Sequence, residues 1–204
     1  MILPGEGNAK GRAADLEQRV AGLERPRARQ ALRDLAFPGV RDDDAVVGPT
    51  GRQGTYLRWE WKGAGAVIVP TDGQRLYLWP MYRYPIGCES LEFPRGAAEP
   101  DESVTDAAAR ELAEETGFAA TRTVILGRVH ADSGLIATSN TVVLAYIDAA
   151  RPGQSRLEAY EAIAGPATAL TTRQLSGYVR NGDITCALTI AAFVHALPYI
   201  GDPA

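Results

Sequence analysis

Cysteine, histidine and long apolar runs are all scarce in this chain of 204 residues. The two cysteines, Cys88 and Cys186, and the two histidines, His130 and His195, do not have the clustered spacing of a structural zinc site. We expect the cysteines to be free thiols in a reducing cytoplasm, with a disulfide between them as the alternative. No apolar run approaches the roughly 20 residues of a membrane span, and the first residues lack the apolar core of a signal peptide. We therefore expect neither a membrane protein nor an exported one.

Positive charge is also limited. The chain has 21 Lys and Arg against 25 Asp and Glu, for a net charge of −4. This balance provides no electrostatic basis for binding nucleic acid or an anionic membrane. The hydrophobic share of 46% is ordinary for a globular protein and is enough to build a core.

The order of patterns predicts an N-terminal extension over residues 1–54 and one domain over residues 55–204. In the extension we expect a disordered start, two short helices within 12–37 and a linker over 38–54. In the domain, alternating or buried apolar runs predict strands at 55–61, 64–69, 75–82, 90–93, 121–130 and 141–147, and a short one within 162–170. Helices are expected at 171–179, with Thr172 as a plausible cap, and at 185–197. Strands and helices in this order predict a mixed sheet covered on both faces by helices, which is an α/β or α+β fold.

The most informative stretch, residues 96–118, reads GAAEPDESVTDAAARELAEETGF. Ser103 and Asp106 form a capping-box pattern before a helical run. Gly117 stands where a left-handed residue would end that helix. The inward face repeats at every fourth position and consists of Val104, Ala108 and Leu112.

This helix brings three carboxylates, Glu111, Glu114 and Glu115, close to one another, because residues three and four apart are neighbours. Such like charges repel unless a cation lies among them, and Mg²⁺ is the cation that prefers carboxylate oxygens, water and phosphates. Arg110 precedes Glu114 by four residues and is placed to brace it. Pro94 and Gly96 fit a tight loop whose backbone carbonyl could also reach the cation. The alternative is an ordinary surface helix with a solvated acidic face.

The pattern resembles the Nudix box. Gly96, five residues, Glu102, seven residues, Arg110-Glu111-Leu112, one residue, Glu114-Glu115, one residue and Gly117 match the family signature, followed by the bulky apolar Phe118. The resemblance implies an α/β/α sandwich. It also implies a homodimer in which N-terminal strands help to build the partner's pocket.

Shorter stretches are similar to the ADP-sugar pyrophosphatase branch of the family. Residues 81–85, MYRYP, resemble its Q-Y-R-Y-P stretch, and residues 92–96, EFPRG, resemble its E-L-P-A-G lead-in. Residues 160–163 and 181–184 resemble its C-terminal part. Met81 departs from the glutamine of the first stretch, and Ser133-Gly134 stands where a proline often follows the box.

The resemblance implies Mg²⁺-dependent hydrolysis, with Mn²⁺ as a possible substitute. The substrate would be a nucleoside diphosphate linked to another group, such as ADP-ribose or a related nucleotide sugar, and the products a nucleoside monophosphate and a sugar phosphate. Two alternatives remain open. One is a Nudix pyrophosphatase for nucleoside triphosphates or dinucleotides, and the other is a non-catalytic nucleotide-binding regulator.

Metal and catalytic roles can be assigned by position within the box. Glu111 and Glu115 are the expected principal metal ligands, Glu114 is a further ligand, and the carbonyl of Gly96 could join them. Glu114 and Arg110 also belong to the catalytic set. Glu102 is either an outer ligand or hydrogen-bond partner, or a charge that favours the start of the helix.

The general base is implied to be a glutamate in a loop well after the box. Glu161 is the first choice and Glu158 the second, and the alternative for Glu161 is a surface acid without a role in catalysis.

Substrate binding needs an anchor for the phosphates and a platform for the base. Arg83 could pair with a phosphate through its planar fork or form a salt bridge to Glu92, and Arg95 is a second candidate. Trp59 or Trp61 could stack on adenine, although aromatic residues on an alternating strand also occur in cores and dimer interfaces.

Overall fold

The computed structural model describes residues 39–47, 51, 53–61, 65–151, 153–155 and 163–201. The chain divides into two compact units, Met1–Lys62 and Gly63–Ala204. The disordered start and short helices expected within residues 1–37 lie outside the described residues.

The described part of the first unit is a two-stranded antiparallel ribbon. Strand β1 (Gly39–Val47) pairs along its whole length with β2 (Gln53–Trp61), so that Gly39 lies opposite Trp61 and Val47 opposite Gln53. β2 is the strand expected at residues 55–61, whereas β1 occupies most of the segment for which a linker was expected. Three consecutive aspartates make β1 a poor strand by intrinsic preference. Backbone pairing with β2 supplies the hydrogen bonds that local sequence does not predict.

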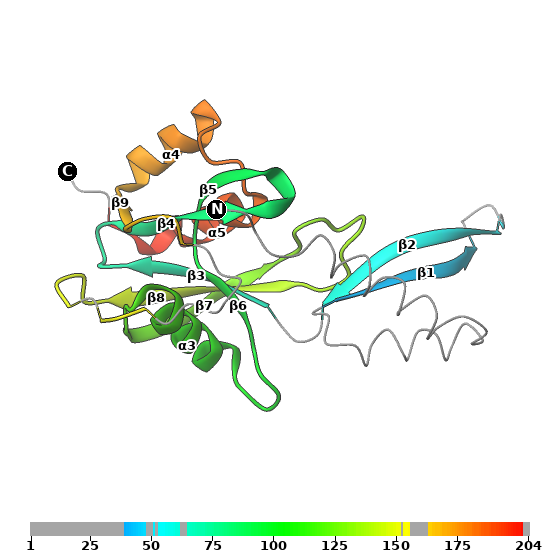
Figure 1. The fold of residues 1–204 in the computed structure, drawn as a ribbon, viewed down its shortest axis with the longest axis horizontal. Coiled ribbons are helices and arrows are strands. Elements are labelled where there is room, and N and C mark those ends of the chain that lie inside the picture. Colours follow the sequence, from blue (N-terminus) through cyan, green and yellow to red (C-terminus); the bar gives the residue numbers. More distant parts are fainter. Residues whose placement is uncertain are drawn as a thin grey trace, which may run out of the picture. The chain divides into compact units, whose positions relative to one another are not determined.

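The second unit is built on a mixed sheet (Figure 1). Its strands follow the order β5-β4-β3-β8-β7, while β6 pairs with β3 and β9 pairs with β4. The pairing of β3 with β8 is parallel, and the other pairings of this sheet are antiparallel. The bounds are β3 (Gly65–Thr71), β4 (Leu76–Arg83), β5 (Cys88–Glu92), β6 (Arg95–Ala97), β7 (Ala120–Val129), β8 (Asn140–Ile147) and β9 (Thr168–Leu170).

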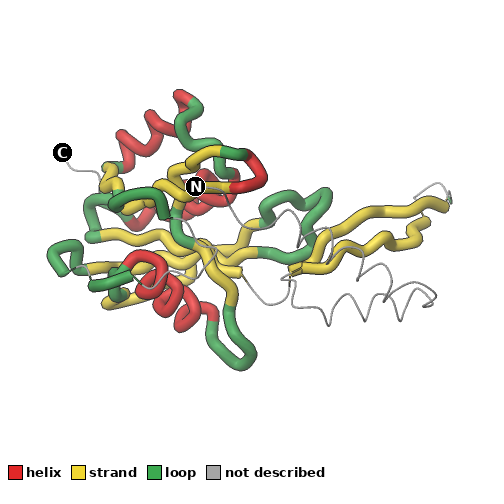
Figure 2. The backbone as a smooth tube through the Cα atoms, in the orientation of Figure 1, coloured by secondary structure: helices red, strands yellow, loops and turns green. Residues whose placement is uncertain are grey.

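Helices cover both faces of this sheet, as the sequence predicts. Helix α3 (Val104–Thr116) lies on one side, and α4 (Thr172–Asn181) and α5 (Ala187–Ala196) lie on the other (Figures 1 and 2). Alternate residues of β3 enter the two layers, because side chains alternate across a strand. Val67 and Val69 pack in the cluster that contains α5, while Ala66 and Ile68 pack in the cluster that contains α3. The α/β/α sandwich is confirmed.

Two local predictions need correction. The expected loop at Pro94 and Gly96 contains strand β6, where Ala66 lies opposite Gly96 and Val67 opposite Arg95. The cap of α4 is Thr171 rather than Thr172: its hydroxyl accepts a hydrogen bond from the Gln174 backbone at 3.2 Å, and the Gln174 side chain accepts one from the Thr171 backbone at 2.9 Å. The glutamine three residues after Thr171 is the signal that distinguishes the two threonines.

Short 3-10 turns at Tyr84–Ile86 and Leu197–Tyr199 complete the described elements. No helix within the described residues is long and apolar enough to cross a membrane.

Candidate active site

Helix α3 begins and ends where its sequence predicts. The Ser103 hydroxyl accepts a hydrogen bond from the Asp106 backbone at 3.1 Å. Gly117 adopts a left-handed conformation with φ of 77°, and its N–H donates to the Ala113 carbonyl at 2.9 Å. Ala108 and Leu112 are completely buried against the sheet. These contacts set the rotation of the helix and therefore the direction of its acidic side chains.

The three acidic side chains do not share one environment. Glu115 is only 4% exposed. The side chain of Glu111, one turn earlier, is 15% exposed, whereas that of Glu114 is 46% exposed. Glu111 and Glu115 are thus the inward pair of the helix, and Glu114 lies toward its solvent side.

Gly96 on β6 makes room for Glu111. A Cβ atom at position 96 would overlap the Cγ and Cδ atoms of the Glu111 side chain. Gly96 does not have a positive φ, so its backbone conformation in β6 does not require glycine. Glycine is needed here for space, because it lets the backbone of β6 lie directly against a carboxylate of α3.

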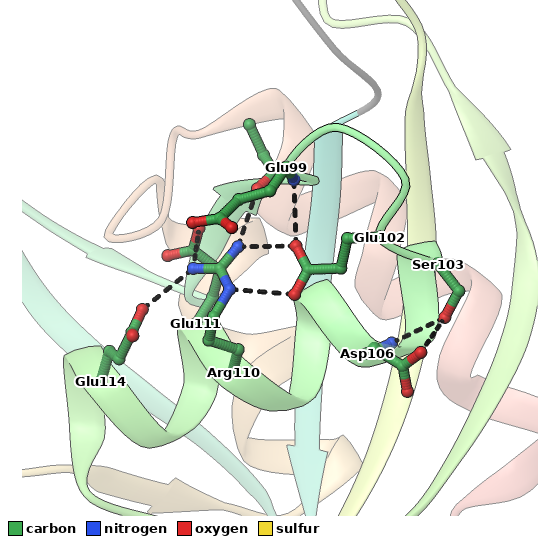
Figure 3. A network of polar contacts seen from close by, with 8 residues as sticks. Glu99, Glu102, Ser103, Asp106, Arg110, Glu111 and Glu114 are labelled. Carbon is green, nitrogen blue, oxygen red and sulfur yellow. Dashed lines mark hydrogen bonds and ion pairs between the residues drawn. The ribbon is translucent and has the colours of Figure 1, made fainter.

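Arg110 links the carboxylates of Glu102, Glu111 and Glu114 into one network of hydrogen bonds (Figure 3). Its guanidinium group donates to both oxygens of Glu102, at 3.0 and 2.9 Å. It also donates to Glu114 at 2.9 Å, to Glu111 at 3.1 Å and to the carbonyl of Ala97 at 3.0 Å. The Arg110 side chain therefore ties α3 to the end of β6 and restrains Glu111.

Within this network, Glu102 and Arg110 hold each other in their charged forms. Hydrogen bonds from Arg110, followed by one from the backbone of Glu99, hold the pKa of Glu102 below its usual value. The hydrogen bond to Glu102 in turn raises the pKa of Arg110 above an already high value. A guanidinium group in this setting cannot exchange protons near neutral pH, so Arg110 positions other groups and does not act as an acid or a base.

A second ionic cluster surrounds Glu92, which is 2% exposed. Its Oε2 atom accepts hydrogen bonds from Arg83 at 3.1 and 2.7 Å and from Arg95 at 2.7 Å. Burial by itself raises the pKa of Glu92, but the hydrogen bond from Arg83 and the charges of Arg95 and Arg83 outweigh burial and lower the pKa. Glu92 is consequently ionised, and the structure contains the Arg83–Glu92 salt bridge that the sequence left as one alternative.

The fit of this site to a divalent cation rests on its donor atoms. Glu111 and Glu115 carry the carboxylate oxygens that hard cations prefer, and the backbone of Gly96 lies directly against the Glu111 side chain. Among the described residues, no group of three or more His, Cys, Asp or Glu side chains is arranged to hold a metal ion. A cation held by Glu111 and Glu115 would therefore need water or substrate oxygens as its other ligands, as Mg²⁺ commonly does.

Several predicted residues have no determined position relative to this site. Glu158 and Glu161 lie outside the described residues. Trp59 lies on β2 in the first unit, half-buried, with its ring edge-on to Trp61 at 5.6 Å. Trp61 is 43% exposed. Ala97 was not predicted, and no side-chain pattern reveals that its carbonyl is an acceptor for Arg110.

Comparison with known families identifies the domain, because residues 61–160 match the NUDIX domain and include the whole of α3. The chain carries a NUDIX domain. An uncharacterised Nudix hydrolase, P35G2.12, of Schizosaccharomyces pombe is 38% identical over 86 residues, which are 42% of each chain. The ADP compounds hydrolase NudE of Escherichia coli is 33% identical over 115 residues, which are 55% of each chain.

The alignments span about half the length of these curated relatives. A crystal structure of an ADP compounds hydrolase superposes on the chain with a TM-score of 0.64 and 21% identity, covering 80% of this chain and 94% of that one. At this identity the superposition shows that the fold is shared.

Proposed function

We propose that the NUDIX domain hydrolyses the diphosphate bond of a nucleoside diphosphate linked to another group, with ADP-ribose or a related nucleotide sugar as the substrate class. The observation that carries this proposal is the packing of Gly96 against Glu111 beside the buried Glu115. Two carboxylates close to each other where a strand meets a helix support a site for a hard cation. The ADP compounds hydrolase among the relatives supports the substrate class.

In this proposal Glu111 and Glu115 hold Mg²⁺, or Mn²⁺ in its place, together with the carbonyl of Gly96. A bound cation would neutralise the diphosphate and lower the pKa of a coordinated water. Glu114 would be a further ligand through its other oxygen, because its Oε2 accepts a hydrogen bond from Arg110 at 2.9 Å. Glu102 acts through Arg110, which it binds with both of its oxygens, and is not itself a metal ligand.

The chain's own residues would orient the substrate and accept the proton released by the attacking water. Arg83 is the first candidate to bind the phosphates and Arg95 the second, and Glu92 holds both guanidinium groups. The free thiols Cys88 and Cys186 are consistent with a reducing cytoplasm. We further propose that the protein acts as a homodimer.

A substrate panel tests the reaction. The full chain is incubated with ADP-ribose, other nucleotide sugars, dinucleotides and nucleoside triphosphates, with Mg²⁺, with Mn²⁺ or with EDTA, and the nucleotide product is separated by chromatography. We expect AMP from ADP-ribose with either cation and none with EDTA. Turnover of triphosphates alone would reassign the substrate class, and no turnover of any compound would contradict hydrolysis.

The general base is tested by two matched substitutions. Glu161→Gln is expected to lower kcat by about 10²- to 10⁴-fold, the usual contribution of a positioned base, and Glu158→Gln much less. Both variants lose one charge from the same segment, so each is the control for the other. A larger loss of kcat in Glu158→Gln would move the assignment to that residue.

A further inference from the structure

Arg95 departs from the family pattern at a position next to the proposed metal ligands in the sequence. The lead-in that residues 92–96 resemble is E-L-P-A-G, with alanine at the fourth position, whereas this chain has arginine there. In the structure Arg95 begins strand β6 and precedes Gly96, which lies against Glu111. Consecutive Cα atoms are about 3.8 Å apart, so the backbone at position 95 lies next to Gly96, while the guanidinium group of Arg95 is held by Glu92 at 2.7 Å.

Arg95 shares its carboxylate partner with Arg83. Both guanidinium groups donate to the same oxygen of Glu92, each with a shortest distance of 2.7 Å. No second carboxylate among the described residues bonds to either arginine. One carboxylate cannot neutralise two permanently charged groups, and the cluster therefore has one positive charge in excess.

This excess charge is open to solvent. The side chains of Arg83 and Arg95 are 30% and 28% exposed, while that of Glu92 is 3% exposed. The carboxylate of Glu92 is thus buried, whereas the two guanidinium groups bonded to it are partly exposed. Because Glu92 occupies few of the five donors on each guanidinium group, the others can receive an external anion in a bidentate manner.

We propose that Arg95 is a substrate-binding residue that, together with Arg83, receives a phosphate of the substrate and favours the more highly phosphorylated members of the substrate class. This inference rests on the proposed function and deepens it. Glu92 is a positioning residue, since it holds both guanidinium groups from a buried site. Without Arg95 the remaining Arg83–Glu92 pair would be neutral, and the net positive charge of this cluster would be lost.

The test measures kcat and KM for ADP-ribose and for an ADP-ribose derivative with one additional phosphate. In Arg95→Ala we expect KM for ADP-ribose to rise about tenfold, the size expected for one charge-assisted hydrogen bond at a partly exposed site, with kcat within about twofold. The rise for the additional-phosphate derivative should be larger. Arg95→Lys, which keeps the charge, should recover part of the loss, and the exposed Arg173→Ala on α4 is the control for loss of a positive charge elsewhere.

Ionic strength separates substrate binding from a purely structural role. If Arg95 faces the substrate, the rise of KM with NaCl should be shallower in Arg95→Ala than in the wild type, because salt screens one fewer attractive charge. An unchanged KM would overturn the inference. So would a raised KM with an unchanged salt dependence, or an equal rise for both substrates, because each would indicate that Arg95 only stabilises Glu92.

The two proposals fail differently. Turnover by the wild type with an Arg95→Ala variant that behaves like Arg173→Ala would remove the inference and leave the proposed function intact. Absence of turnover by the wild type would remove the proposed function. In that case the role of Arg95 is tested by measuring the dissociation constant for ADP by calorimetry. Equal dissociation constants for the wild type and Arg95→Ala would overturn the inference.

Discussion

Glu115→Gln is expected to lower kcat by about 10³-fold while the fold remains intact. Glu115 lies on the inward side of α3 and is 4% exposed, so a metal ligand at this position is shielded from bulk water. Glutamine keeps the size of the side chain and removes its negative charge. A bound cation supplies several kcal/mol of transition-state stabilisation, and each 1.36 kcal/mol corresponds to about tenfold in rate. Steady-state kinetics of ADP-ribose hydrolysis over a range of Mg²⁺ concentrations would measure the loss.

The control is Glu89→Gln, which removes the same charge from an exposed position on β5. Circular dichroism and thermal unfolding of both variants show whether the fold is retained. A Glu115→Gln variant with native unfolding behaviour and wild-type turnover would exclude Glu115 from the metal site. A requirement for more Mg²⁺ to reach half-maximal rate would, in contrast, support direct ligation.

Gly96→Ala should reduce kcat by about 10²-fold, the cost that a displacement of about 1 Å can have at a reacting centre. The added Cβ atom would overlap the Cγ and Cδ atoms of Glu111, so this carboxylate must move away from β6. Overpacking also costs about 1–3 kcal/mol of stability, which urea unfolding can measure separately from activity. The substitution adds one methyl group and changes no charge.

Gly177→Ala is the matched control for this substitution. Gly177 lies within α4, and a Cβ atom there would meet nothing within 4 Å. Alanine should therefore stabilise the chain by about 0.4–1 kcal/mol and leave kcat unchanged. If Gly96→Ala also left kcat unchanged, the close approach of β6 to Glu111 would have no role in catalysis.

Local sequence was sufficient for α3 because each of its signals acts within a few residues. Ser103 caps the first turn, Gly117 supplies the left-handed residue at the end, and Leu112 marks the buried face. The ion pair between Arg110 and Glu114 is also local, since residues four apart are neighbours on a helix. These features required no knowledge of the rest of the chain.

Strands β1 and β6 were not recognised because their hydrogen-bond partners lie elsewhere in the chain. β6 has only three residues and becomes a strand by pairing with β3, about 30 positions earlier. The triple aspartate of β1 likewise forms a strand only against β2. A pattern that considers neighbouring residues alone cannot contain this information.

The box spacing, the caps of α3 and the order of strands and helices could be read from the chain alone, because they depend on short-range geometry and on apolar periodicity. Folding assigned different environments to residues of the same type. It buried Glu115, exposed Glu114 and turned Arg83 and Arg95 onto one oxygen of Glu92. Burial and long-range ion pairing depend on which elements pack together, and that packing brings residues from β4, β5 and β6 to a single carboxylate.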